Sequence, residues 1–233
     1  MVLGYSALGA GLSIAPLSLS MFAVALVAGR RAGDRRPAAL IQVGFLLMMV
    51  GMFAIVPLVP RVSSGWYLAI PLIVAGSGLG LLVSQLNNYT LAPISEERIS
   101  EAAGVNSAGG SFGLSFGLAL SGALMLAVLS FAITTMTDDS DVLPADQKQQ
   151  IEDSLEDDAE VMSDAQLEDL LADESPEVQD EVIDINDEGR DLGLQVALLV
   201  PLLAGLLGFA NSFRMKRQPD ITPQANLEGV GFD

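Results

Sequence analysis

Polar side chains gather at the ends of two apolar stretches of this chain. Ser84, Gln85 and Asn87 stand near the end of one stretch, and Asn106 and Ser111 stand near the start of the next. Amide and hydroxyl groups among apolar residues need hydrogen-bond partners, so they could bind a solute in a wet cavity. They could equally lie at an interface with water. Both interpretations stay open, and these five residues are the candidate cavity-lining residues.

Covalent chemistry has little support. The chain contains no Cys and no His, which excludes thiol nucleophiles, His-based catalysis and ordinary zinc or haem sites. The apolar stretches offer serines but no acid or base beside them. Carboxylate runs such as Asp138, Asp139 and Asp141 lack the loop pattern of a calcium site. We therefore expect no enzyme activity, no cofactor and no metal site.

Five stretches are long enough to cross a membrane, which takes roughly 20 apolar residues. None of them contains an acidic or basic residue. A soluble protein of this length has too little polar surface to cover five such helices. The sequence therefore predicts an all-α membrane protein with five transmembrane helices. The stretches are Ala7–Ala28, Pro37–Val59, Gly65–Asn87, a span within Gly104–Ile133, and Gly193–Phe213.

Charge is confined to the segments between these stretches. The net charge of −18 comes from 29 acidic and 11 basic residues among 233, and residues 137–192 hold 22 of the acids. A nucleic-acid binder with a basic surface is excluded. Eight of the 11 basic residues fall on one side of the predicted membrane. The positive-inside rule then places the N-terminus outside, the acidic segment outside and the C-terminus in the cytoplasm. A multi-pass protein of the plasma or inner membrane is expected.

The predicted organisation has four parts. Residues 1–135 form a four-span bundle, 136–192 an acidic extracytoplasmic loop, 193–213 the last span and 214–233 a cytoplasmic tail. Ile151, Leu155, Met162, Leu167, Leu170 and Leu171 recur at roughly helical spacing within the loop, and Val178, Val182 and Ile185 follow the Ser175-Pro176 step. Short helices that cap the outer face of the bundle and a largely disordered loop are both consistent with this pattern.

Small residues recur at intervals of four in two spans. Gly76 and Gly80 share one face of the third span, and Gly109, Gly113 and Gly117 share a stripe on the fourth. Such stripes let helix backbones approach closely. The sequence predicts helix packing at these five glycines. Sliding of one helix against another during transport would use the same smooth face.

Four blocks of the sequence resemble one family in order and position. They are VLGYSALGAGL at 2–12 followed by Pro16, GRRAGDRR at 29–36, EAAGVN at 101–106 with FGLSFGLA at 112–119, and INDEGR at 185–190. They are similar to segments near the last five helices of the fourteen-helix drug:proton antiporters of the major facilitator superfamily. The resemblance implies an alternating-access efflux transporter that binds substrate between two pseudo-symmetric halves.

The resemblance also gives the basic loop a role. In the family, acidic and basic residues of this loop lock the cytoplasmic helix ends together in one state. The matching positions are Gly29, Arg30, Asp34, Arg35 and Arg36, although Asp34 lies one position later than the usual spacing and Gly33 occupies the expected slot. A cluster that only fixes membrane topology is the alternative.

The resemblance covers nearly the whole chain but supplies only five of fourteen spans. We therefore expect a C-terminal portion of a transporter, from a truncated gene, a misplaced start or a split gene, that is not active alone. Expected partners are the lipid bilayer, the missing N-terminal helices and, when complete, small amphipathic or cationic substrates. The alternative is a small five-span membrane protein whose acidic outer loop binds a partner or cations.

Overall fold

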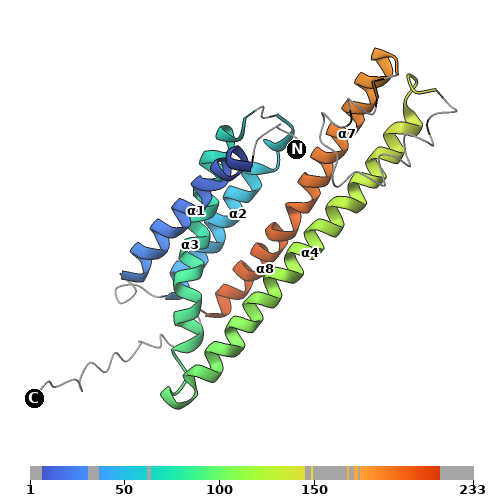
Figure 1. Cartoon of the computed structure of the whole chain (residues 1–233). Coiled ribbons are helices and arrows are strands. Elements are labelled where there is room, and N and C mark those ends of the chain that lie inside the picture. The colour runs from blue at the N-terminus through green and yellow to red at the C-terminus, as the bar shows by residue number, and fades with distance from the viewer. Residues whose placement is uncertain are drawn as a thin grey trace, which may run out of the picture.

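The computed structural model describes residues 7–30, 37–61, 64–144, 148, 167, 171–172 and 174–215. All regular secondary structure in these residues is helical (Figure 1). Six α-helices and three short 3₁₀ helices account for all of it except the isolated helical residues Lys148 and Leu167. These helices are α1 (Ala7–Arg30), α2 (Pro37–Ile55), η1 (Val59–Arg61), η2 (Gly65–Leu68), α3 (Ala69–Leu91), η3 (Glu96–Arg98), α4 (Ile99–Asp139), α7 (Pro176–Ala197) and α8 (Leu199–Met215).

Helix α3 lies between α1 and α2 and packs along the length of both. Its glycines make this possible, because a Cβ added at Gly80 would lie 2.5 Å from the Met21 carbonyl oxygen on α1. On the other side, Gly51 of α2 faces the Ala75 backbone nitrogen, 2.5 Å from an added Cβ. Ile41, Met48 and Leu82 form a buried cluster between α2 and α3. Small residues thus set the spacing of this three-helix unit.

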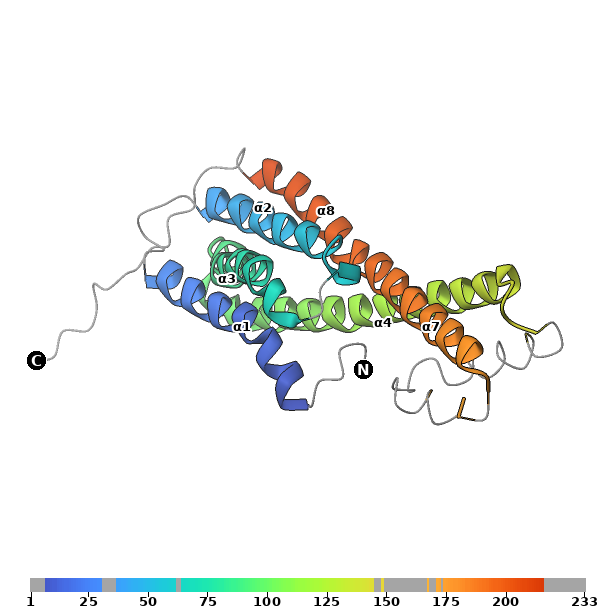
Figure 2. The same ribbon diagram turned by 90° about the horizontal axis from the view of Figure 1, so that it is seen from above.

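Helices α4, α7 and α8 are the other long helices in the described part of the chain. Helix α7 packs along the second half of α4, and α8 continues from α7 after a single turn residue, Leu198, to pack against α2. Seen from above, α8 lies beside α2, and α7 crosses α4 (Figure 2). We call the end where α4 and α7 project together the stalk end. The opposite end, with Arg30 and the α3–α4 turn, is the turn end.

The stalk has a hydrophobic core of its own. Leu129 and Ile133 of α4 pack with Val178, Val182 and Ile185 of α7, together with Leu143, Leu167 and Leu171. Helix α7 begins where Ser175 accepts a hydrogen bond from the Val178 backbone N–H at 3.4 Å, with Pro176 in the first turn. Both residues are favoured at a helix start. The second apolar run of the acidic segment is therefore helical.

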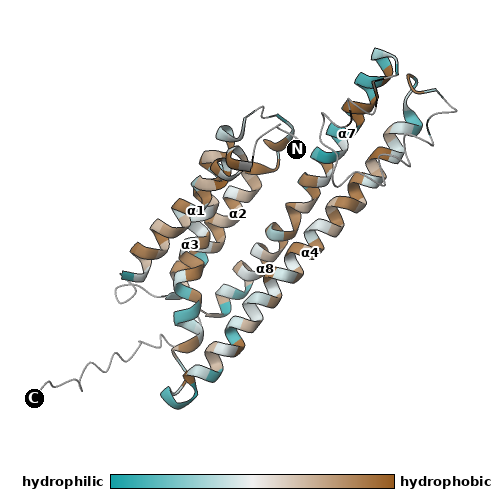
Figure 3. Cartoon of the chain, viewed as in Figure 1, coloured by the Kyte–Doolittle hydropathy of each residue, from teal (hydrophilic) through white to brown (hydrophobic). Residues whose placement is uncertain are grey.

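Five helical segments are long and apolar enough to cross a membrane, by length and composition. Apolar residues dominate the middle of each, and hydrophilic residues gather at the helix ends and along the stalk part of α7 (Figure 3). The predicted helical membrane fold with five spans agrees with this. The side of the membrane that each end faces stays a prediction.

Around the acidic segment, the helices run further than the sequence pattern indicates. Helix α7 has 22 residues and does not cap the bundle, because it runs along α4 away from α1, α2 and α3 and joins the last span directly. Helix α4 has 41 residues and extends beyond both ends of the stretch Gly104–Ile133, so it contains the span predicted within that stretch. Ile151, Leu155, Met162 and Leu170 lie outside the described residues. The boundaries at 135 and 192 fall inside α4 and α7, and the division into four parts stays a prediction.

Candidate functional site

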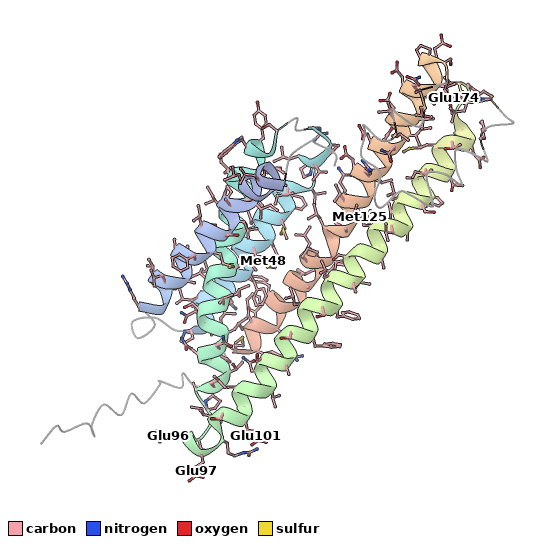
Figure 4. All side chains as sticks on the ribbon, viewed as in Figure 1. Met48, Glu96, Glu97, Glu101, Met125 and Glu174 are labelled. Carbon is pink, nitrogen blue, oxygen red and sulfur yellow. The ribbon has the colours of Figure 1, made fainter. Side chains whose placement is uncertain are left out.

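Two of the candidate cavity-lining residues meet at the turn end. The Asn106 side-chain amide donates to the Asn87 carbonyl Oδ1 at 2.6 Å, joining α4 to α3. Asn106 also lines a hollow of about 580 Å³ that continues past Thr90 and Ile94 to the Arg98 side chain. Arg98 Nε bonds Glu101 Oε2 at 3.2 Å on its exposed rim. The α3–α4 turn thus borders an open hollow with both polar and apolar walls. Glu96, Glu97 and Glu101 lie at the same turn (Figure 4).

Two further candidates join α3 to the end of α1. Gln85 is fully buried, and its Nε2 donates to Ser84 Oγ at 3.1 Å and, more weakly, to the Ala28 carbonyl at 3.5 Å. Its Oε1 has no hydrogen-bond partner among the described residues. A Cβ at Gly29 would lie 3.7 Å from Ser84 Oγ. Because the last carbonyls of a helix lack partners within it, Gln85 offers a weak donor to the end of α1 just before the basic loop.

The remaining candidate residues take part in neither of these two contacts. Ser111 is exposed on α4, five positions beyond Asn106. Gly29 and Arg30 are exposed at the end of α1, while Asp34, Arg35 and Arg36 lie outside the described residues. The gating role of the loop therefore stays a prediction, as does the cavity-lining role of the polar residues.

The five predicted packing glycines divide into two groups. Gly76 and Gly80 lie against the backbone of α1, where Leu17 and Met21 provide the nearest carbonyls. Gly109, Gly113 and Gly117 have open space where a side chain would stand, with no described atom within 4 Å of an added Cβ. Among the described residues, nothing packs against the small-residue stripe of α4, and its role in helix packing stays a prediction.

One feature of the structure was not anticipated from sequence. Asp184, Asp187, Glu188 and Asp191 of α7 line a hollow of about 550 Å³ together with Gln195 and Pro60. The Gln195 side chain donates to the Val56 carbonyl at 3.1 Å and ties α7 to the end of α2. The spacing of three, four and seven residues between these acids puts them on one helix face. The sequence contains this spacing, but so many other acids surround it that the spacing alone does not single out these four.

The two hollows can form hydrogen bonds and ionic contacts. Both the turn-end hollow and the acidic hollow present amide, hydroxyl or carboxylate groups. In the described ranges, no three His, Cys, Asp or Glu side chains are grouped so that they could hold a metal ion.

Comparison with known proteins gives one partial match of interest. The chain is 26% identical over 140 residues to a probable actinorhodin transporter of Streptomyces coelicolor. The similarity is to part of a transporter. It covers 59% of this chain, which spans about a quarter (24%) of the length of that relative. No family model matches the chain, and no solved structure matches it.

Proposed function

We propose that this chain is the C-terminal portion of a multidrug efflux transporter of the major facilitator superfamily. Two observations support the proposal together: five helical segments could cross a membrane, and 59% of the chain is similar to a quarter of a probable transporter. The similarity to a longer membrane transporter is the observation that carries it. When complete, the protein would exchange protons for small amphipathic or cationic substrates by alternating access.

The packing of the bundle supports a rocking mechanism. Helices α1, α2 and α3 form one closely packed unit, whereas α4 meets α3 mainly through the turn and the Asn87–Asn106 bond. A unit of this kind can move as a rigid body while a few polar contacts at its end exchange. The Gln85 contact with Ala28 would transmit the position of α3 to the basic loop.

The first test uses the DNA upstream of Met1. An in-frame continuation that encodes about nine further apolar spans supports the proposal, because fourteen spans complete the family pattern. The complete reading frame, expressed in a susceptible host, should then lower accumulation of a cationic dye in a proton-dependent manner. The chain of residues 1–233 expressed alone should not. Proton-dependent efflux from vesicles that contain only this chain would contradict the proposal.

Orientation needs a separate test. In this Cys-free chain, Asp141→Cys lies at an exposed position of the stalk end and Glu97→Cys at an exposed position of the turn end. We expect a membrane-impermeant maleimide to label the first in intact cells and the second only after permeabilisation. The reverse pattern would show that the acidic stalk lies in the cytoplasm.

The projecting stalk favours a second candidate function. Its core of apolar residues supports α7, which carries many acids along its length, as a small membrane protein that binds an external partner or cations would need. An upstream region without transporter-like sequence, with a promoter directly before Met1, would favour this alternative.

A further inference from the structure

One face of the α7–α8 helix changes from acidic to apolar along its length. Asp184, Glu188, Asp191 and Gln195 follow one another at spacings of three or four residues, and the same spacing continues through Leu199, Leu202 and Leu206. Residues at such spacings share a helix face. The first group lines the acidic hollow, and the second lines a groove against α2. The two concave sites therefore lie one above the other on the same side of the helix.

The lower site is an apolar groove of about 590 Å³ between α2 and α8. Its wall on α2 includes Val50 and Phe53, and its wall on α8 includes Leu203 and Leu206. Phe53 is 72% exposed and Leu203 is 60% exposed, so no described residue covers the groove. An apolar channel of this size, open along one side within the membrane-crossing part of two helices, has the shape and polarity for a hydrocarbon chain.

The boundary between the two sites lies near the membrane surface. Gln195 bonds the Val56 carbonyl between the groove, which includes Ala54, and the acidic hollow, which includes Pro60. A few residues further, Trp66 and Tyr67 are 71% and 66% exposed on η2. Exposed Trp and Tyr mark the headgroup level of a bilayer. The acids thus lie where a lipid headgroup would lie, and the groove lies where its acyl chain would lie.

The charged side chains at this level would favour some lipid headgroups over others. The hollow is lined by four carboxylates. The exposed cation Arg61 directly follows the lining residue Pro60, and its Nη1 donates to the Pro57 carbonyl at 3.1 Å. A headgroup that pairs an ammonium with a phosphate complements both charges. A primary ammonium can also donate hydrogen bonds to carboxylates, and charge-assisted bonds of this kind are stronger than neutral ones.

We propose that this composite site binds a phospholipid with a primary ammonium headgroup, of the phosphatidylethanolamine type, in the leaflet at the stalk end. One acyl chain lies in the α2–α8 groove, the ammonium faces the carboxylates of α7, and the phosphate lies near Arg61. This bound lipid joins α2 to the α7–α8 helix. The inference does not depend on transport by the chain.

The test uses the single Trp of the chain. Trp66→Phe combined with Phe53→Trp gives a protein whose only indole lies in the groove, and it is reconstituted as the full chain into lipid nanodiscs. Quenching of this indole is measured at a low mole fraction of one brominated lipid. The brominated lipid is phosphatidylethanolamine, phosphatidylcholine or phosphatidylglycerol, in an otherwise identical bilayer. Trp66→Phe with Leu12→Trp, at an exposed position of α1, reports ordinary lipid contact.

We expect phosphatidylethanolamine to be enriched at the groove about three- to fivefold over phosphatidylglycerol, the size of one favourable charge contact near a membrane surface. Phosphatidylcholine should fall between them. The preference should vanish in Asp187→Asn/Asp191→Asn and persist in Glu177→Gln/Asp180→Asn, a matched pair on the same helix outside the hollow. The Leu12→Trp reporter should show no preference.

Three results would overturn the proposal. They are equal quenching by all three lipids at the groove, a preference for phosphatidylglycerol, and a preference that survives neutralisation of Asp187 and Asp191. Weak quenching by every lipid at the groove, with normal quenching at Leu12→Trp, would show instead that protein covers the groove.

Discussion

Helices α3 and α4 carry similar glycine patterns and use them differently. In α3, Gly76 and Gly80 lie against the backbone of α1, and Gly78 lies against the backbone of α2. In α4, Gly109, Gly113 and Gly117 face open space. The same spacing of small residues therefore lies against neighbouring helices in α3 and against no described residue in α4. A small-residue stripe predicts close approach, but the chain itself need not supply the partner.

We expect the largest loss of stability from adding a side chain at the close contact between α1 and α3. Gly80→Ala places a Cβ 2.5 Å from the Met21 carbonyl and 3.1 Å from the Ala25 backbone nitrogen. Because these are backbone atoms, α1 must move as a whole, and we expect a loss of about 2–3 kcal/mol of stability. Unfolding by a denaturing detergent, followed by circular dichroism, measures it. Gly11→Ala on α1, where nothing lies within 4 Å, is the control, and equal stability of the two variants would contradict the tight α1–α3 contact.

A smaller effect is expected at the buried amide between α3 and α1. Gln85→Ala leaves a cavity and removes the bond to Ala28, so we expect a loss of about 2 kcal/mol in the same unfolding assay. Gln85→Met keeps the volume and also removes the Oε1 atom that has no described partner. It should recover most of the loss. If Met is as damaging as Ala, hydrogen bonding and not packing holds the end of α1.

The polar link between α3 and α4 should contribute less. Asn87→Ala, Asn106→Ala and the double variant form a thermodynamic cycle for the 2.6 Å amide bond. Side-chain hydrogen bonds between membrane helices average about 0.6 kcal/mol in such cycles. A coupling of that size is expected, and additive effects of the two substitutions would mean that the bond does not hold α4 to α3.

The smallest effect is expected on the open face of α4. Gly113→Ala in this chain alone should change stability by less than about 0.5 kcal/mol, as at an uncontacted surface position. In a complete transporter the same substitution should cost about 1–3 kcal/mol if another helix packs on this stripe. Negligible effects in both proteins would show that the stripe faces lipid. The glycines of α4 would then not mark a helix interface in the complete transporter either.

Hydropathy alone located the spans because a run without charges has few alternatives to a membrane helix. It could not locate the helix ends. Helix α4 continues from Val128 through Asp138 and Asp139, because acidic residues end an apolar run but do not end a helix. The start of α7 was visible in Ser175 and Pro176, which favour a helix start wherever they stand.

The site was less predictable. Sequence spacing brought Asn87 and Asn106 into the same candidate set, but the pairing of their amides depends on the geometry of the α3–α4 turn. The acidic face of α7 and the apolar groove below it depend on the packing of α8 against α2. That packing is set by long-range contacts, such as Gly205 against Met48 and Met49, and residue patterns within one helix do not specify it.

The length of α4 has a mechanical consequence. At about 1.5 Å per residue, its 41 residues extend roughly 60 Å, about twice the thickness of the hydrocarbon core. Because α7 braces its outer half, a tilt of α4 within the membrane must swing the stalk tip through several ångströms. A fluorophore near Glu174 at that tip (Figure 4) would therefore report movements of the membrane helices from a position in water.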